Sequence, residues 1–297
     1  MKILKSKTWQ LINFAVLCAL LVCASLARAE SRVECSEVNS AILKRAVAYC
    51  VMLPPSYDSD KSRRYPVLYY LHGLGDNEQS MINAGGWNEY EDLLEKKKVG
   101  EFLVVTPNGY RSFYINSRDG SFRYEDFFLK EFIPAIEKKY RIKAARASRG
   151  IMGVSMGGYG AFHYAFKFPQ MFTSVSAHMA ALRESTPPDM GDTRDGKIMG
   201  DVFGAPFDAA YYRQNSPFTL AKKAPLAQLR RLHIYFDVGQ DDDYGFNLGG
   251  EDLHKLLDKR GIKNEFHVFP GSHNLMYAME HFEASLVMHS KAFGLTK

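Results

Sequence analysis

A serine at position 155 lies in the sequence Gly153-Val154-Ser155-Met156-Gly157, after an apolar run and before a stretch of helical character. In a G-x-S-x-G turn between a strand and a helix, the backbone is strained, and the glycines remove side chains that would clash there. The serine hydroxyl is then exposed at the end of the strand. We therefore predict that Ser155 is a nucleophile; an ordinary glycine-rich turn is the alternative.

A serine hydroxyl attacks only when a base removes its proton, and the base needs a carboxylate to orient it. The chain has nine histidines. His273 lies in a Pro-Gly-Ser-His-Asn turn after the last expected strand, where the chain order Ser, Asp, His places the base. The others fall within expected strands (His233, His267), on expected helices (His163, His254, His281, His289) or after strands, where they could line a pocket (His72, His178). His273 is the predicted base.

The carboxylate should follow the expected strand at 232–236, where Asp237, Asp241, Asp242 and Asp243 are all available. Their position along the chain does not show which of these four aspartates orients the histidine. A cation site is the alternative use of three consecutive aspartates, but the run lacks the glycine and glutamate spacing of a calcium loop.

Two backbone N–H groups are needed to bind the negative charge that develops on the attacked carbonyl. The residue after the nucleophile, Met156, supplies the first. The second is expected from the loop Leu71-His72-Gly73-Leu74-Gly75, which directly follows a strand and has glycines that allow close backbone approach. We predict Leu74 as this donor; an ordinary tight turn is the alternative.

From about residue 67 to the C-terminus, short apolar runs alternate with amphipathic stretches. This pattern predicts an α/β fold with a mostly parallel sheet and helices on both faces. Strands are expected at 67–71, 102–106, 150–154, 172–177, 232–236 and 265–269. Helices are expected at 125–140, kinked by Pro134, and at 251–260. No repeat or linker divides the sequence, so we expect one domain over residues 30–297.

The segment 182–217 interrupts this alternation because it is rich in glycine and proline and has no sustained period. Long irregular insertions in compact domains often cover binding sites. We predict that this segment forms one wall of a substrate pocket, and a plain surface loop is the alternative.

Residues 1–29 have the pattern of an export signal: a basic start, an apolar run at 14–26 and the small-x-small site Ala27-Arg28-Ala29. We expect cleavage before Glu30 and a periplasmic or extracellular protein with no stable membrane insertion. A retained membrane anchor is the alternative, but the run is shorter than the roughly 20 residues of a spanning helix. A lipoprotein anchor at Cys23 is a further alternative.

Cleavage would leave Cys35 and Cys50 in an oxidising compartment. The segments around them read as two short strands with a turn near Asn39-Ser40, so we predict a disulfide between them. Two free buried thiols are the alternative.

The chain has 297 residues, 46% of them hydrophobic, with 38 basic and 33 acidic side chains. This composition suits a globular domain with a large core. Four of the basic residues and none of the acids lie in the first 29 positions, so the remainder is close to neutral. A nucleic-acid partner therefore has little electrostatic support.

Several segments together resemble the esterases of the α/β-hydrolase fold that include S-formylglutathione hydrolase, feruloyl esterases and mycolyltransferases. The matching segments are Leu53-Pro54-Pro55-Ser56-Tyr57, Tyr70-Leu71-His72-Gly73-Leu74-Gly75, Gly86-Trp87, the Ser155–Ala161 elbow, Gly239-Gln240-Asp241-Asp242 and Gly271-Ser272-His273. In these families the acid lies three residues after the glycine of G-x-x-D, which implies Asp242, with Asp241 as the alternative. The family's tryptophans after the histidine are replaced here by Asn274-Leu275-Met276-Tyr277-Ala278, which leaves the substrate open.

The residues and the resemblance together predict an exported serine carboxylesterase that needs no metal or organic cofactor. Acetyl or feruloyl esters of polysaccharides are the first expected substrate class, with Trp87, Tyr114 and Tyr277 as candidate substrate-binding residues. Acyl transfer to a sugar, thioester hydrolysis and a catalytically silent binding protein are the alternatives.

Overall fold

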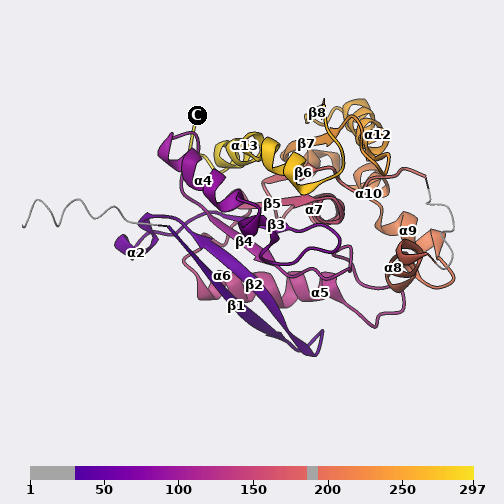
Figure 1. Cartoon of the computed structure of the whole chain (residues 1–297), viewed down its shortest axis with the longest axis horizontal. Coiled ribbons are helices and arrows are strands. Elements are labelled where there is room, and N and C mark those ends of the chain that lie inside the picture. Colours follow the sequence, from indigo (N-terminus) through magenta and orange to yellow (C-terminus); the bar gives the residue numbers. More distant parts are fainter. Residues whose placement is uncertain (1–30, 186–192) are drawn as a thin grey trace, which may run out of the picture.

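The computed structural model describes residues 31–185 and 193–297, which form a layered molecule around an eight-stranded sheet (Figure 1). The strand order is β1-β2-β4-β3-β5-β6-β7-β8. The strands are β1 Arg32–Ser40, β2 Arg45–Leu53, β3 Val67–Leu71, β4 Leu103–Pro107, β5 Arg149–Val154, β6 Ser174–His178, β7 His233–Gly239 and β8 Glu265–Phe269. Strands β1, β2 and β4 pair antiparallel, and all other neighbours pair parallel. The expected α/β architecture with a mostly parallel sheet is confirmed.

The central strands are buried throughout because helices cover both of their faces. Every residue of β3, β4, β5 and β6 is buried. The edge strand β1 instead alternates between exposed and partly buried residues. Strand β6 begins two residues later than predicted and β7 continues to Gly239, so both carry the chain further toward the carboxyl edge of the sheet.

Two groups of helices enclose the sheet. The helices are α2 Ser56–Ser59, α3 Ser80–Asn83, α4 Gly86–Glu95, α5 Tyr124–Phe127, α6 Ile133–Lys139, α7 Met156–Lys167, α8 Arg194–Phe203, α9 Ala209–Asn215, α10 Pro217–Lys223, α11 Leu226–Leu229, α12 Phe246–Lys259 and α13 Leu275–Ala292. Helices α4 and α13 lie side by side over one face, with Tyr90, Phe282 and Leu286 in their core. Helices α5, α6, α7, α10 and α12 bury the other face.

The helix expected at 125–140 is interrupted where Pro134 enters it. A π-helical turn, Phe128–Phe132, separates α5 from α6, and Pro134 lies in the first turn of α6. Proline has no N–H to donate to the preceding turn, so the helix widens there rather than continuing regularly.

The expectation of an irregular segment at 182–217 is wrong in part, because it contains α8 and α9. These helices bury Ile198, Val202, Phe203 and Tyr212, most of them in a third apolar cluster with Tyr159 of α7. Glycines at 196 and 200 concealed the helical spacing of the apolar residues in the sequence.

The predicted disulfide is confirmed: Cys35 and Cys50 face each other in the β1–β2 register and are bonded. The turn between the strands lies at 41–44 rather than near Asn39-Ser40, because β1 continues to Ser40. The predicted export signal at 1–29 lies outside the described residues. Among the described helices, none is both long and apolar enough to cross a bilayer.

We expect tryptic digestion without reduction to yield one linked peptide that holds both Cys35 and Cys50, since Lys44 and Arg45 offer cleavage between them. The double variant Cys35→Ser/Cys50→Ser should lose about 3 kcal/mol of unfolding free energy, because the bridge restricts the unfolded chain. Mass spectrometry and denaturant titration measure the two effects. Separate cysteine peptides in the unreduced digest would contradict the bond.

Candidate active site

Ser155 lies in the tight turn between β5 and α7 with a backbone φ of 53° and ψ of −115°. Non-glycine residues seldom adopt such values, and they are held only where the surroundings enforce them. A Cβ on Gly153 would lie 2.1 Å from the Gly157 carbonyl oxygen, and a Cβ on Gly157 would lie 1.9 Å from that of Leu71. Only glycine fits at both positions, which explains the spacing of the motif.

Backbone hydrogen bonds to the end of β6 fix this turn. The Ser155 N–H donates to the His178 carbonyl at 3.0 Å, and the Ser155 carbonyl accepts from the N–H groups of Tyr159 and Ala181, both at 3.0 Å. The strained conformation is therefore tied to the sheet on one side and to the helix on the other.

His273 lies in the loop after β8 and contacts both of its predicted partners. Its Nε2 is 2.9 Å from Ser155 Oγ, and its Nδ1 is 2.7 Å from Asp242 Oδ2. An ionised carboxylate only accepts hydrogen bonds, so Nδ1 carries the proton and Nε2 is free to accept that of the serine. The three side chains form a continuous chain from carboxylate to hydroxyl.

Asp242 follows β7, and its carboxylate is fully buried. Burial acts to raise its pKa, but the hydrogen bonds from His273 and from the Phe246 and Tyr244 N–H groups outweigh burial and hold the pKa below its ordinary value. The carboxylate therefore stays charged near neutral pH and can orient His273.

The other candidate acids lie elsewhere. Asp241 is exposed, and Asp243 accepts a long, 3.3 Å bond from the His273 backbone N–H. Asp237 is buried within β7 beside His178, 2.9 Å from Nδ1 of that residue. Among the described residues, no group of histidine, cysteine and acidic side chains is arranged to hold a metal ion.

Two aromatic rings that the sequence analysis missed enclose His273. Tyr244 and Phe246 pack edge-on against its ring, with centroids 4.8 and 5.4 Å away. Tyr244 lies in the turn that carries Asp242, and Phe246 begins α12 directly after that turn, so Asp242 and the packing partners of His273 come from one segment. The sequence could have identified these two aromatic residues only after Asp242 had been chosen, because their only distinguishing feature is that they follow it by two and four residues.

The two predicted oxyanion donors flank Ser155. The backbone of Gly73 is close to Ser155, because a Cβ there would lie 3.7 Å from Ser155 Cβ, and Leu74 follows directly. Met156 begins α7. Within the described ranges, neither the Leu74 nor the Met156 N–H donates to another residue, so both are available to a ligand.

The histidines that follow strands are structural. His72 is buried, accepts from the Gly109 N–H at 2.8 Å, and has its pKa lowered by burial. His178 is buried between Asp237 and Ser285. Neither lines the pocket, contrary to one reading of the sequence, because the ends of β3 and β6 turn both rings into the core.

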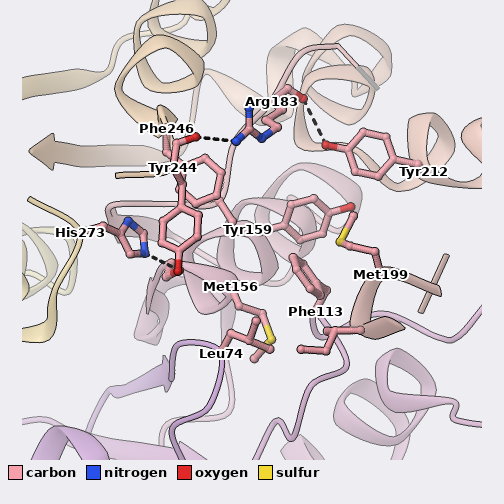
Figure 2. Close-up of a pocket in the computed structure, with 13 residues that line it drawn as sticks. Leu74, Phe113, Met156, Tyr159, Arg183, Met199, Tyr212, Tyr244, Phe246 and His273 are labelled. Atoms are coloured by element: carbon pink, nitrogen blue, oxygen red, sulfur yellow. Dashed lines mark hydrogen bonds between the residues drawn. The ribbon is translucent and has the colours of Figure 1, made fainter. Parts of the chain in front are cut away.

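A cavity of about 420 Å³ opens beside Ser155 and His273 (Figure 2). Its wall is largely apolar and aromatic. The lining residues are Leu74, Phe113, Ser155, Met156, Tyr159, Ala181, Arg183, Ile198, Met199, Tyr212, Tyr244, Phe246 and His273. The segment 182–217 supplies Arg183, Ile198, Met199 and Tyr212, so it contributes the wall predicted for it.

The predicted substrate-binding residues Trp87, Tyr114 and Tyr277 do not line this cavity, and these three assignments are corrected. Tyr114 is fully buried and donates from its hydroxyl to the His72 carbonyl at 3.0 Å. Trp87 of α4 and Tyr277 of α13 pack in the core on the other face of the sheet. Phe113, directly before Tyr114, is the residue that reaches the cavity.

The chain matches, over residues 40–293, the family model described as "Putative esterase". It belongs to this esterase family. Esterase Rv1288 of Mycobacterium tuberculosis is 28% identical over an alignment of 249 residues, and the match covers 75% of this chain and 51% of that protein. The chain thus spans about half the length of this relative.

Solved structures give the same fold. The esterase chain superposes on a ferulic acid esterase with a TM-score of 0.77 and 28% identity, covering 89% of this chain and 99% of the other. An S-formylglutathione hydrolase from Staphylococcus aureus has a TM-score of 0.72 at 20% identity and covers 88% of this chain and 99% of its own. The expected α/β-hydrolase fold is confirmed.

Proposed function

We propose that the chain is a serine carboxylesterase that uses Ser155, His273 and Asp242. The observation that carries this proposal is the unbroken hydrogen-bond chain from the Asp242 carboxylate through His273 to the Ser155 hydroxyl, at the wall of an apolar cavity. Membership of the esterase family supports an ester as the substrate.

In this mechanism, His273 takes the Ser155 proton as the hydroxyl attacks the ester carbonyl, and Asp242 stabilises the resulting imidazolium. The N–H groups of Leu74 and Met156 bind the oxyanion. His273 then protonates the leaving alcohol, and water, activated by the same ring, releases the acid from Ser155. In this mechanism, His273 accepts or donates the proton in every transfer step.

The cavity supports an acyl group with an apolar or aromatic body, because Phe113, Tyr159 and Met199 line it. A ferulic acid esterase among the similar structures makes a feruloyl or smaller acyl ester of a polysaccharide the first substrate to examine. The Cys35–Cys50 disulfide supports an exported protein, with residues 1–29 as a signal and 30–297 as the esterase domain.

We expect the chain to hydrolyse both methyl ferulate and 4-nitrophenyl acetate. Met199→Trp should lower kcat/KM for methyl ferulate by roughly tenfold more than for the acetate, because the larger ring fills the cavity and the small ester needs less of it. Initial rates with both esters measure the change.

Lys197→Trp is the matched control, since Lys197 is exposed on the same helix and is not a lining residue. An equal change for both esters in Met199→Trp would reject the cavity as the acyl site. Hydrolysis of neither ester by the unaltered chain would reject the esterase proposal itself.

A further inference from the structure

One permanent charge interrupts the apolar wall of the cavity. Apart from His273 and Arg183, the described lining residues carry uncharged side chains. Arg183 lies opposite the Leu74 end of the cavity in Figure 2, beside Tyr212 and Phe246. The attack on an ester by Ser155 does not require a cation at this position.

The Arg183 side chain is held in place from two directions. Its guanidinium carbon lies 5.2 Å from the centroid of the Phe246 ring, and one Nη donates to the Tyr244 carbonyl. Its own carbonyl is 3.4 Å from the Tyr212 hydroxyl. A guanidinium fixed in this way loses little conformational freedom when it binds a ligand.

The fork of Arg183 retains donors for a ligand. A guanidinium has five N–H groups, and the bond to Tyr244 accounts for one of them. No carboxylate of the described residues pairs with it; the adjacent Glu184 instead pairs with Lys222 at 2.7 Å. A half-buried cation in an apolar wall favours an anion beside it, and a planar fork matches a carboxylate best.

We propose that Arg183 is a specificity residue that binds a carboxylate on the substrate, so that the site prefers esters carrying a negative charge away from the ester bond. The proposal rests on the esterase function proposed above. The carboxylate could belong to the acid, as in a hemiester of a dicarboxylic acid, or to the alcohol, as in an acetylated uronic acid.

Two matched substrate pairs test this preference and distinguish the two sources. The first pair is 4-nitrophenyl hydrogen adipate and 4-nitrophenyl methyl adipate, whose chains are long enough to avoid attack by their own carboxylate. The second is acetylated galacturonic acid and acetylated galactose. For each pair, the selectivity is the kcat/KM of the acid divided by that of the neutral ester.

Arg183→Gln should reduce the selectivity in at least one pair by about tenfold or more, since it removes a charge-assisted bidentate contact. Arg183→Lys should restore part of it, because the charge remains but the fork is lost. Lys222→Gln, which removes a nearby surface cation that is not in the wall, should leave both selectivities unchanged.

If Arg183→Gln slows both members of both pairs equally, Arg183 only braces the Tyr244 segment and the proposal is wrong. An equal loss of selectivity in Lys222→Gln would also overturn it, because long-range charge would then be the cause. If the unaltered chain hydrolyses none of the four esters, this result would count against the esterase function instead. In that event, calorimetry with monomethyl adipate decides: the Ser155→Ala protein should bind it, and Ser155→Ala/Arg183→Gln should not.

Discussion

Ser155→Ala is expected to lower kcat for ester hydrolysis by about a million-fold, because loss of the nucleophile removes the acyl-enzyme route as a whole. The residual rate would come from binding and from the Leu74 and Met156 N–H groups. Alanine adopts the backbone of Ser155 with a strain similar to that of serine, so thermal unfolding should change little. Hydrolysis of 4-nitrophenyl acetate and a melting curve measure the two quantities.

Covalent labelling provides an independent measurement of the same role. A fluorophosphonate should add one adduct to the unaltered chain, at Ser155, and none to Ser155→Ala. Ser272→Ala is a suitable control, because Ser272 neighbours His273 and its hydroxyl only accepts from the Asn274 amide at 2.9 Å in the described contacts. Activity near that of the unaltered chain in Ser155→Ala, at unchanged stability, would exclude this serine as the nucleophile.

Asp242→Asn should lower kcat by roughly four orders of magnitude. The amide can donate to His273 Nδ1, which stabilises the tautomer with the proton on Nε2, and that nitrogen can then no longer accept the Ser155 proton. Asp241→Asn and Asp243→Asn are the matched controls, because both are exposed and neither contacts the His273 ring. A larger loss of kcat in Asp241→Asn than in Asp242→Asn would show that Asp241, and not Asp242, is the residue that orients His273.

The same variant has an effect on stability whose sign follows from the pKa. The pKa of Asp242 is lowered in the folded chain, so its carboxylate stabilises the fold fully above its unfolded pKa of about 3.9 and loses this effect as the pH falls through the folded value. Asp242→Asn should therefore be less stable than the unaltered chain at pH 7, and the difference should shrink in acid. Denaturant titrations of both proteins at pH 7 and at a pH below about 3.9 measure this difference in unfolding free energy.

The sequence predicted the sheet and the turn that carries Ser155 because their signals are local. Continuous apolar runs mark strands buried on both faces, and β3 was predicted with its observed bounds. The bounds of the partly exposed edge strand β8 were also predicted as observed. The glycines around Ser155 are required by contacts with the next turn and with β3. Chain order selected His273 among nine histidines. Asp242 needed the family resemblance, because four aspartates lie after the strand expected at 232–236 and only the folded chain shows which of them contacts the His273 ring.

The lining of the cavity was decided by the tertiary structure alone. Phe113 and Tyr114 are neighbours, both with positive φ, at 51° and 61°, yet Phe113 lines the cavity and Tyr114 fills the space beside Gly109 and Gly160. Trp87 and Tyr277 face the opposite core. An aromatic side chain is equally suited to a core and to a cavity, so its type predicts neither, and its direction depends on backbone turns and packing between segments far apart in the chain. The same holds for Arg183, whose place in the wall is set by Tyr244 and Phe246, about sixty residues later.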